Sequence, residues 1–396
     1  MNGLHSGEIL MPATESIRWK GRDATRLSNG LVEMTALTQG GHLAEFRFSN
    51  QNVTSSENVL WESSWMAPGH AGSRLDEQLE TGGFTGHALC LDYFGAPSPE
   101  EAAAGLPIHG EAGAERWNVH ELAETEGTAC RWTVRLPVAQ LDFERTIRLL
   151  NQQSVVYVEE TVHNERDVDH ICQWVEHATF SPPFLSHTDS TLAVSATLGI
   201  TSPTEYEGGS LLAVNQEFSW PYAPRQGVEG STVDLRRPFS TEGFGFGAAV
   251  ELDPRRKVEF LLAMNWKLRL GVGYCFRRED FPWMAIWEEN CARLGQPWNG
   301  NTQARGMEFG TTPFSVRGEE ARRRGNIFDN PTWCVIPAHG QKTARYLIFL
   351  FAIPDGIHSI ENVEIEGDAI VLSDERAKFS FSVSALGCRD FLLPNS

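Results

Sequence analysis

Two histidines stand where a side chain could exchange a proton with a bound molecule. His109 lies in the segment Leu106-Pro-Ile-His-Gly-Glu-Ala112, and the glycine that follows it allows a ligand to approach the backbone closely. His177 lies on a predicted strand within Gln173–Leu185, which runs into a rigid Pro-Pro turn. Because histidine titrates near neutral pH, each is a candidate acid or base; a structural hydrogen bond is the alternative for each.

A carboxylate forms the third candidate. Glu308 lies between Met307 and Phe309 in an otherwise apolar, glycine-flanked strand, where a charge is costly. Such a group either pairs with a cation, here Arg305 or Arg317, or keeps a raised pKa and serves as a general base. The sequence leaves both possibilities open.

The elements that must position these residues are predicted to be strands. Segments with period-two or β-rich patterns recur along the whole chain: Val32–Leu37, Leu43–Phe48, Cys130–Leu136, Leu141–Leu150, Val155–Val162, Val258–Met264, Leu268–Cys275, Arg345–Phe351 and Lys378–Val383. Helical patterns are limited to Pro99–Ala104 and Met284–Leu294, and no βαβ alternation occurs. We therefore predict an all-β chain of antiparallel sheets that forms one domain over residues 1–396.

Composition and charge narrow the classes of ligand. The chain has 396 residues, 41% of them hydrophobic and 21% charged, as in ordinary globular proteins. Its formal net charge of −19 repels nucleic acid and anionic membranes and is compatible with a neutral carbohydrate. Met1–Arg18 lacks a signal-peptide pattern and no apolar run is long enough to span a bilayer, so we expect a cytoplasmic protein.

The seven cysteines are scattered, odd in number and without a CxxC pair. This argues against a disulfide framework and against a zinc cluster, so we expect reduced, mostly buried thiols and no metal site.

Four motifs occur in the order found in aldose 1-epimerases: Ile108-His-Gly, Glu176-His-Ala-Thr-Phe, Gly306-Met-Glu-Phe and Val335-Ile-Pro-Ala-His-Gly-Gln-Lys-Thr. The chain thus resembles the galactose mutarotase-like family over nearly its whole length. The resemblance implies a β-supersandwich and an isomerase that interconverts hexose anomers without a cofactor. It also implies Glu308 as the base, His177 as the acid and His109 as a hydrogen-bonding group near the ring oxygen.

The resemblance is incomplete around the first histidine, because Gly86–Gly95 contains no arginine where the family usually has an Asn-Arg pair. For the rest of the pocket, sugars present apolar C–H faces to aromatic rings and hydroxyl groups to polar side chains. On that basis the candidate substrate-binding residues are His87, Asp92, Trp220, Lys267, Trp283 and Trp287.

Two other functions compete with the isomerase. The same fold could serve as a carbohydrate-binding protein in which the histidines and the glutamate only form hydrogen bonds. A glycoside hydrolase or lyase would need a second carboxylate opposite Glu308, and Asp92 and Glu111 are the candidates. The isomerase gains support if His177 and Glu308 project into one cleft within reach of opposite sides of a pyranose ring, and it fails if they are far apart. The oligomeric state is left open.

Overall fold

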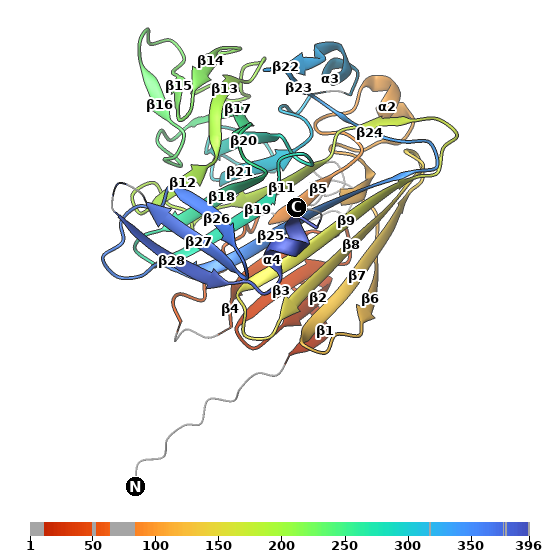
Figure 1. The fold of residues 1–396 in the computed structure, drawn as a ribbon. Coiled ribbons are helices and arrows are strands. Elements are labelled where there is room, and N and C mark those ends of the chain that lie inside the picture. The colour runs from red at the N-terminus through yellow and green to blue at the C-terminus, as the bar shows by residue number, and fades with distance from the viewer. Residues whose placement is uncertain are drawn as a thin grey trace.

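The computed structural model describes residues 12–49, 53–63, 84–316, 318–374, 376 and 378–394. Two antiparallel sheets dominate it (Figure 1). The larger has eleven strands in the order β1 (Ala13–Trp19), β2 (Arg22–Ser28), β3 (Val32–Leu37), β4 (Leu43–Phe48), β5 (His87–Cys90), β11 (Val175–Phe180), β21 (Gln303–Gly310), β20 (Trp283–Asn290), β17 (Phe244–Leu252), β13 (Ala196–Thr201) and β14 (Glu217–Ser219).

The second sheet has eight strands in the order β12 (Ser190–Val194), β18 (Val258–Asn265), β19 (Leu270–Arg277), β25 (Gln341–Ala352), β9 (Val155–Asn164), β8 (Leu141–Leu150), β7 (Gly127–Leu136) and β6 (Asn118–Leu122). A three-stranded sheet follows near the C-terminus, formed by β26 (Asn362–Glu366), β27 (Ala369–Asp374) and β28 (Phe379–Ser384).

The remaining elements are short. Three two-stranded pairs join β10 (His170–Cys172) to β24 (Cys334–Ile336), β15 (Tyr222–Pro224) to β16 (Thr232–Asp234) and β22 (Asn326–Ile327) to β23 (Asn330–Pro331). The helical segments within the described ranges are α2 (Pro99–Ala103), α3 (Gly318–Arg324), α4 (Cys388–Leu392) and the 3₁₀ turn η2 (Glu111–Gly113). Among these, none is long and apolar enough to cross a membrane.

Side-chain alternation explains how the layers pack. On β9, Val156 and Val158 enter the main core between the two large sheets, whereas Val155 and Tyr157 point to the opposite face. There they meet side chains of the three-stranded sheet, such as Ile370 and Leu372. The eight-stranded sheet is therefore covered on both faces by other sheets. The eleven-stranded sheet packs against it with one face, so its outer face is available for a site.

Most predicted elements are confirmed. The bounds of β3, β4 and β8 agree with the prediction, and α2 ends within one residue of it. The helix predicted at Met284–Leu294 is wrong, because most of this segment is β20, paired on both sides with β17 and β21. Apolar side chains cover both faces of this central strand, and such a run cannot be told from a buried helix by its periodicity.

Candidate functional site

The site is built on the outer face of the eleven-stranded sheet. His177 of β11 lies directly opposite Glu308 of β21 in the antiparallel register. On β11, Ala178 and Phe180 enter the main core, whereas Val175 packs in the cluster on the outer face. Because successive side chains alternate between faces, His177 shares the outer face with Val175, and Glu176 points into the core.

His177 and Glu308 are in direct contact. Nε2 of His177 lies 2.9 Å from Oε1 of Glu308, and both side chains are more than nine-tenths buried. The approach is not aligned as a hydrogen bond, and Oε1 forms none with any residue in the described part of the chain. The cation proposed for this carboxylate does not serve it, because Arg305 pairs with Glu288 instead. Arg317 lies outside the described residues.

Two neighbours shape this pair. Thr179 Oγ1 lies 2.9 Å from Nδ1 of His177, which leaves Nε2 for Glu308 and the cavity. Gly306 faces the pair from β21, where a Cβ atom would lie 2.2 Å from Oε1 of Glu308 and 3.1 Å from Cε1 of His177. A glycine is needed at this position because any side chain would displace the carboxylate.

His109 approaches from the loop before η2. Its backbone has a φ of +64°, and its Nδ1 accepts a hydrogen bond of 3.1 Å from the amide of Gly95. Its ring centroid lies 6.0 Å from that of His177 and 5.0 Å from that of Phe84. Desolvation, with a smaller contribution from His177, lowers the pKa of His109 to about 3. His109 is therefore neutral at physiological pH, with its remaining proton on Nε2.

These three residues line one cavity of about 410 Å³. This volume lies within the range of small-molecule sites. Aromatic rings form much of the wall, and they come from distant parts of the chain: Trp61, Phe84, Phe94, Tyr206, Trp287, Trp298 and Phe314. The cavity thus combines apolar surfaces with a few convergent polar groups.

Part of the cavity wall is a cluster of side chains joined by hydrogen bonds and an ion pair. Trp287 donates a hydrogen bond of 2.8 Å to the hydroxyl of Tyr206, which in turn donates to Glu289 at 2.9 Å. Arg293 also binds Glu289, at 2.6 Å, and its guanidinium stacks 3.4 Å from the ring centre of Trp298. Nη2 of Arg293 is buried and makes no hydrogen bond to a described residue.

Solved structures share this architecture. A galactose mutarotase-like protein from Clostridium acetobutylicum matches with 12% identity and a TM-score of 0.59, over 87% of this chain and 100% of that chain. A galactose mutarotase related enzyme from Lactobacillus acidophilus matches with 13% identity and a TM-score of 0.54, over 85% and 100%. A galactose mutarotase-like protein from Lactobacillus casei matches with 12% identity and a TM-score of 0.52, over 83% and 99%.

The chain has the galactose mutarotase-like fold. No protein-family model and no curated protein matches its sequence. At these identities, the likeness to solved structures establishes the fold alone.

Within the galactose mutarotase-like fold, one of the six candidate substrate-binding residues, Trp287, lines the cavity. The prediction for His87 is corrected. His87 is fully buried, and its Nε2 lies 2.9 Å from Oε2 of Glu176 on the core side of the sheet. Leu89 of β5 faces the core with it, while Ala88 and Cys90 face outward. The sequence pattern did not reveal which of the two faces was the outer one.

The other four candidates also lie outside the cavity. Asp92 binds Nε2 of His170 at 2.8 Å, and Trp283 is buried and donates to the carbonyl of Pro331. Trp220 packs against the main core beyond β14. Lys267 is exposed on the turn between β18 and β19, in the other sheet. Residue type alone could not separate these core and surface positions from the site.

Sequence reasoning missed several wall residues of this galactose mutarotase-like fold. Tyr206 and Arg293 lie in loops without a recognisable motif, and Trp61 precedes β5 by a long stretch of chain. The one usable signal was the Gly-rich segment Gly295–Gly306, whose first part is the loop before β21 and holds Trp298. No group of three His, Cys, Asp or Glu side chains within the described ranges is arranged to hold a metal ion.

A core network lies directly behind the site. Oε2 of Glu176 lies 3.4 Å from Nη2 of Arg145, which also binds Glu160. Tyr346 donates to Glu160 at 2.9 Å. Burial raises the pKa of Glu160 to about 8 and, together with Arg145, lowers the pKa of His87 to about 3. The network therefore holds Arg145 and two carboxyl groups of which one, Glu160, is protonated near neutral pH.

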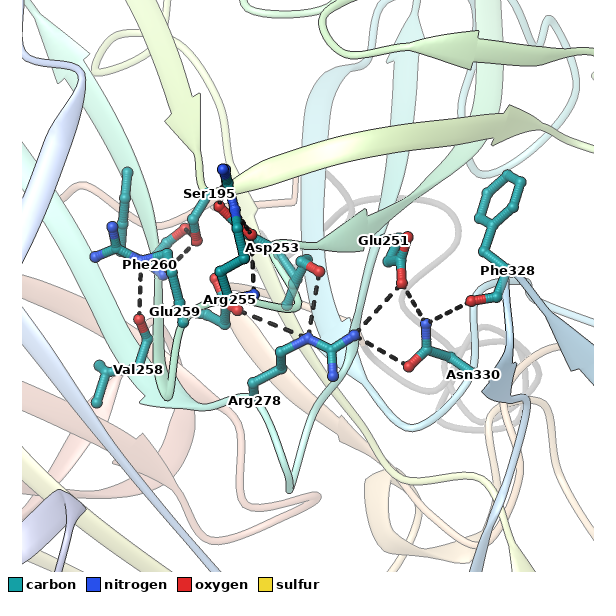
Figure 2. Close-up of polar contacts among 12 residues, drawn as sticks. Ser195, Glu251, Asp253, Arg255, Val258, Glu259, Phe260, Arg278, Phe328 and Asn330 are labelled. Carbon is teal, nitrogen blue, oxygen red and sulfur yellow. Dashed lines mark hydrogen bonds and ion pairs between the residues drawn. The ribbon is translucent and has the colours of Figure 1, made fainter. Parts of the chain in front are cut away.

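A further buried carboxyl, that of Glu259 near the start of β18, lies outside the lining of the cavity and beside Arg278 (Figure 2). Glu259 is fully buried, and neither oxygen forms a hydrogen bond of good geometry to a described residue. Arg278 lies 3.9 Å from it, but its Nη2 binds Glu251 and Asn330. Burial raises the pKa of Glu259 to about 7.

Proposed function

We propose that the protein is an aldose 1-epimerase-like isomerase that interconverts the anomers of a free or modified hexose by acid/base ring opening. The observation that carries the proposal is the 2.9 Å contact between Nε2 of His177 and Oε1 of Glu308 at the wall of one cavity. A buried carboxylate oxygen without a hydrogen bond contributes little to stability. Beside an imidazole nitrogen, the carboxylate and the histidine form a suitable acid/base pair. The likeness to structures described as galactose mutarotase-like agrees with this proposal.

The reaction requires an acid and a base beside one carbon atom of the sugar. In a pyranose, the O1 hydroxyl and the ring oxygen O5 are bonded to the same carbon, so an acid and a base must reach two neighbouring atoms. Glu308 takes the proton from O1 while protonated His177 gives its proton to O5, and the C1–O5 bond breaks. After rotation about C1–C2, the reverse transfers close the ring as the other anomer. This reaction needs neither a metal ion nor a cofactor.

His109 acts as a positioning donor in this proposal. Gly95 occupies its Nδ1, so the neutral ring presents Nε2–H to a substrate oxygen near O5. The low pKa keeps the His109 ring neutral, so His109 adds no positive charge that would disfavour protonated His177. The aromatic wall would hold the apolar face of the sugar.

Asp92 and Glu111, the two candidates for the carboxylate that a hydrolase would need opposite Glu308, are bound to other residues. Glu111 accepts hydrogen bonds from the amides of Val138 and Ala139, and Asp92 binds His170. Neither residue lines the cavity. The acidic residues that do line it besides Glu308 are Glu205 and Glu207, both on an exposed loop.

Anomer exchange measured by NMR over a panel of free aldoses and sugar acids tests the proposal. We expect exchange above the uncatalysed rate for at least one sugar, and a loss of about 10²–10⁴-fold in Glu308→Gln and in His177→Asn. Glu366→Gln, at an exposed position of β26, is the matched control and should leave the rate unchanged.

Circular dichroism and thermal unfolding should be the same in the variants and the parent. Sugar binding without exchange would overturn the isomerase and favour the carbohydrate-binding protein. Near-parental exchange in Glu308→Gln would remove this residue from the mechanism.

A further inference from the structure

Two cysteines that are far apart in the sequence face one another in the structure. Cys172 on β10 and Cys334 on β24 are directly opposite partners in an antiparallel pair. Their sulfur atoms are 3.1 Å apart, and the two residues are 2% and 7% exposed. Other cysteines have different neighbours: Cys130 contacts the hydroxyl of Thr14, and Cys388 contacts the carbonyl of Gly367.

The geometry of this pair permits a disulfide bond. A covalent S–S bond is about 2.05 Å long and joins residues whose Cα atoms are about 4.4–6.8 Å apart. Directly opposite residues of an antiparallel pair have Cα atoms about 4.5–5.5 Å apart. Closing the bond therefore needs a sulfur displacement of about 1 Å without movement of the strands.

We propose that Cys172 and Cys334 form a reversible intrachain disulfide when the protein meets a peroxide. The site is a dithiol under reducing conditions and a covalent cross-link under oxidising ones. The proposal does not rest on the proposed isomerase activity, because neither cysteine lines the cavity.

The two sulfurs have unequal roles. A hydrogen bond from Cys172 and the nearby Lys342 ammonium lower the pKa of the Cys334 thiol, whereas the same hydrogen bond and burial raise the pKa of Cys172. The Cys334 thiolate attacks hydrogen peroxide, forming a sulfenic acid and releasing hydroxide. The sulfur of Cys172 then attacks the sulfenic sulfur, the S–O bond breaks, and the thiol proton leaves with the oxygen as water. Two thiols are oxidised and one peroxide is reduced.

The cross-link would join segments 162 residues apart beside the cavity wall. Gln173, next to Cys172, accepts a hydrogen bond from the amide of Phe94 at 3.0 Å and donates one to Thr312 at 3.0 Å. Phe94 and the residues that follow Thr312 line the cavity. The disulfide would therefore hold this wall in place.

Thiol counting by mass spectrometry tests the proposal on the full-length chain. The protein is treated with hydrogen peroxide while folded, then denatured, alkylated and digested. We expect two of the seven thiols to resist alkylation, the unlabelled mass to fall by two hydrogens, and the peptides containing Cys172 and Cys334 to be linked. Dithiothreitol should restore all seven thiols.

Two variants make the test specific. The loss of two thiols should disappear in Cys172→Ser and persist in Cys275→Ser, another buried cysteine. Seven alkylated thiols in the oxidised parent protein, or a link that maps to another pair, would overturn the proposal. The parent protein alone decides this outcome, so a variant that fails to fold does not leave the question open.

Discussion

Glu176 and His177 are neighbours on one strand, yet they belong to two regions with opposite character. On the core side, Glu176 joins Arg145, His87 and Tyr346 in a network that satisfies its oxygens. On the outer side, His177 meets Glu308, whose Oε1 has no aligned hydrogen bond in the described part of the chain.

The difference separates structural from functional charged groups in the interior of this fold. Charged groups surrounded by hydrogen-bonding partners hold the two sheets in register, whereas a carboxylate whose contact is a histidine at the wall of a cavity is available for chemistry. Each of the variants below changes one side of this comparison.

The largest effect is expected from breaking the core network. Arg145→Met removes the buried cation that contacts Glu160 and Glu176 and leaves Glu176 without its cationic partner. We expect the free energy of unfolding in urea to fall by about 3–5 kcal/mol. Arg131→Met is the control: Arg131 makes an exposed ion pair with Glu144 on β8, and its loss should cost less than about 1 kcal/mol. Equal costs would show that the network contributes little.

The next effect falls on the outer pair. Gly306→Ala would place a methyl group 2.2 Å from Oε1 of Glu308 and so push the carboxylate away from His177. We expect anomer exchange to fall by about 10²-fold, since misplacement of a catalytic group by about 1 Å has this cost. Gly295→Ala is the control, because nothing lies near its added methyl group. An unchanged rate in Gly306→Ala would separate the contact from the chemistry.

Glu259 tests whether a buried carboxyl with a raised pKa is enough to mark function. It is fully buried beside Arg278 (Figure 2) and does not line the cavity. Its folded pKa of about 7 exceeds the unfolded value of 4.5. Its contribution to stability is therefore full below about pH 4.5 and is lost as the pH rises through 7.

Relative to Glu259→Gln, the parent protein should lose about 1–3 kcal/mol of unfolding free energy between pH 5 and pH 9. Anomer exchange should be the same in both proteins. Urea unfolding at several pH values checks the first expectation, and a parallel pH dependence of the two proteins would contradict it.

The smallest effect concerns the orientation of His177. Thr179→Val removes the hydroxyl 2.9 Å from Nδ1 and keeps the shape of the side chain. We expect kcat to fall about tenfold, the value of one hydrogen bond to a charged group, while KM stays constant. Thr179→Ser should restore kcat. A change in KM alone would mean that Thr179 supports the wall of the cavity and not the proton transfer.

The sequence alone determined the class of fold and indicated three residues that the structure brings to one cavity. Period-two patterns predicted β3, β4 and β8 with their bounds, because alternation is a local property of a strand with one buried face. His109, His177 and Glu308 could be named because their motifs occur in the order found in aldose 1-epimerases, whereas residue types alone left a structural role open for each.

Tertiary structure decided which face each strand turns to the core. Alternation separates His177 from Glu176 and His87 from Ala88, but it does not say which face meets the second sheet. That depends on pairing between distant strands, as does the pairing of β20 that excluded the predicted helix. For the same reason, the wall residues Tyr206 and Arg293 and the facing thiols of Cys172 and Cys334 left no local pattern. Their proximity is a property of the sheets and not of any one segment.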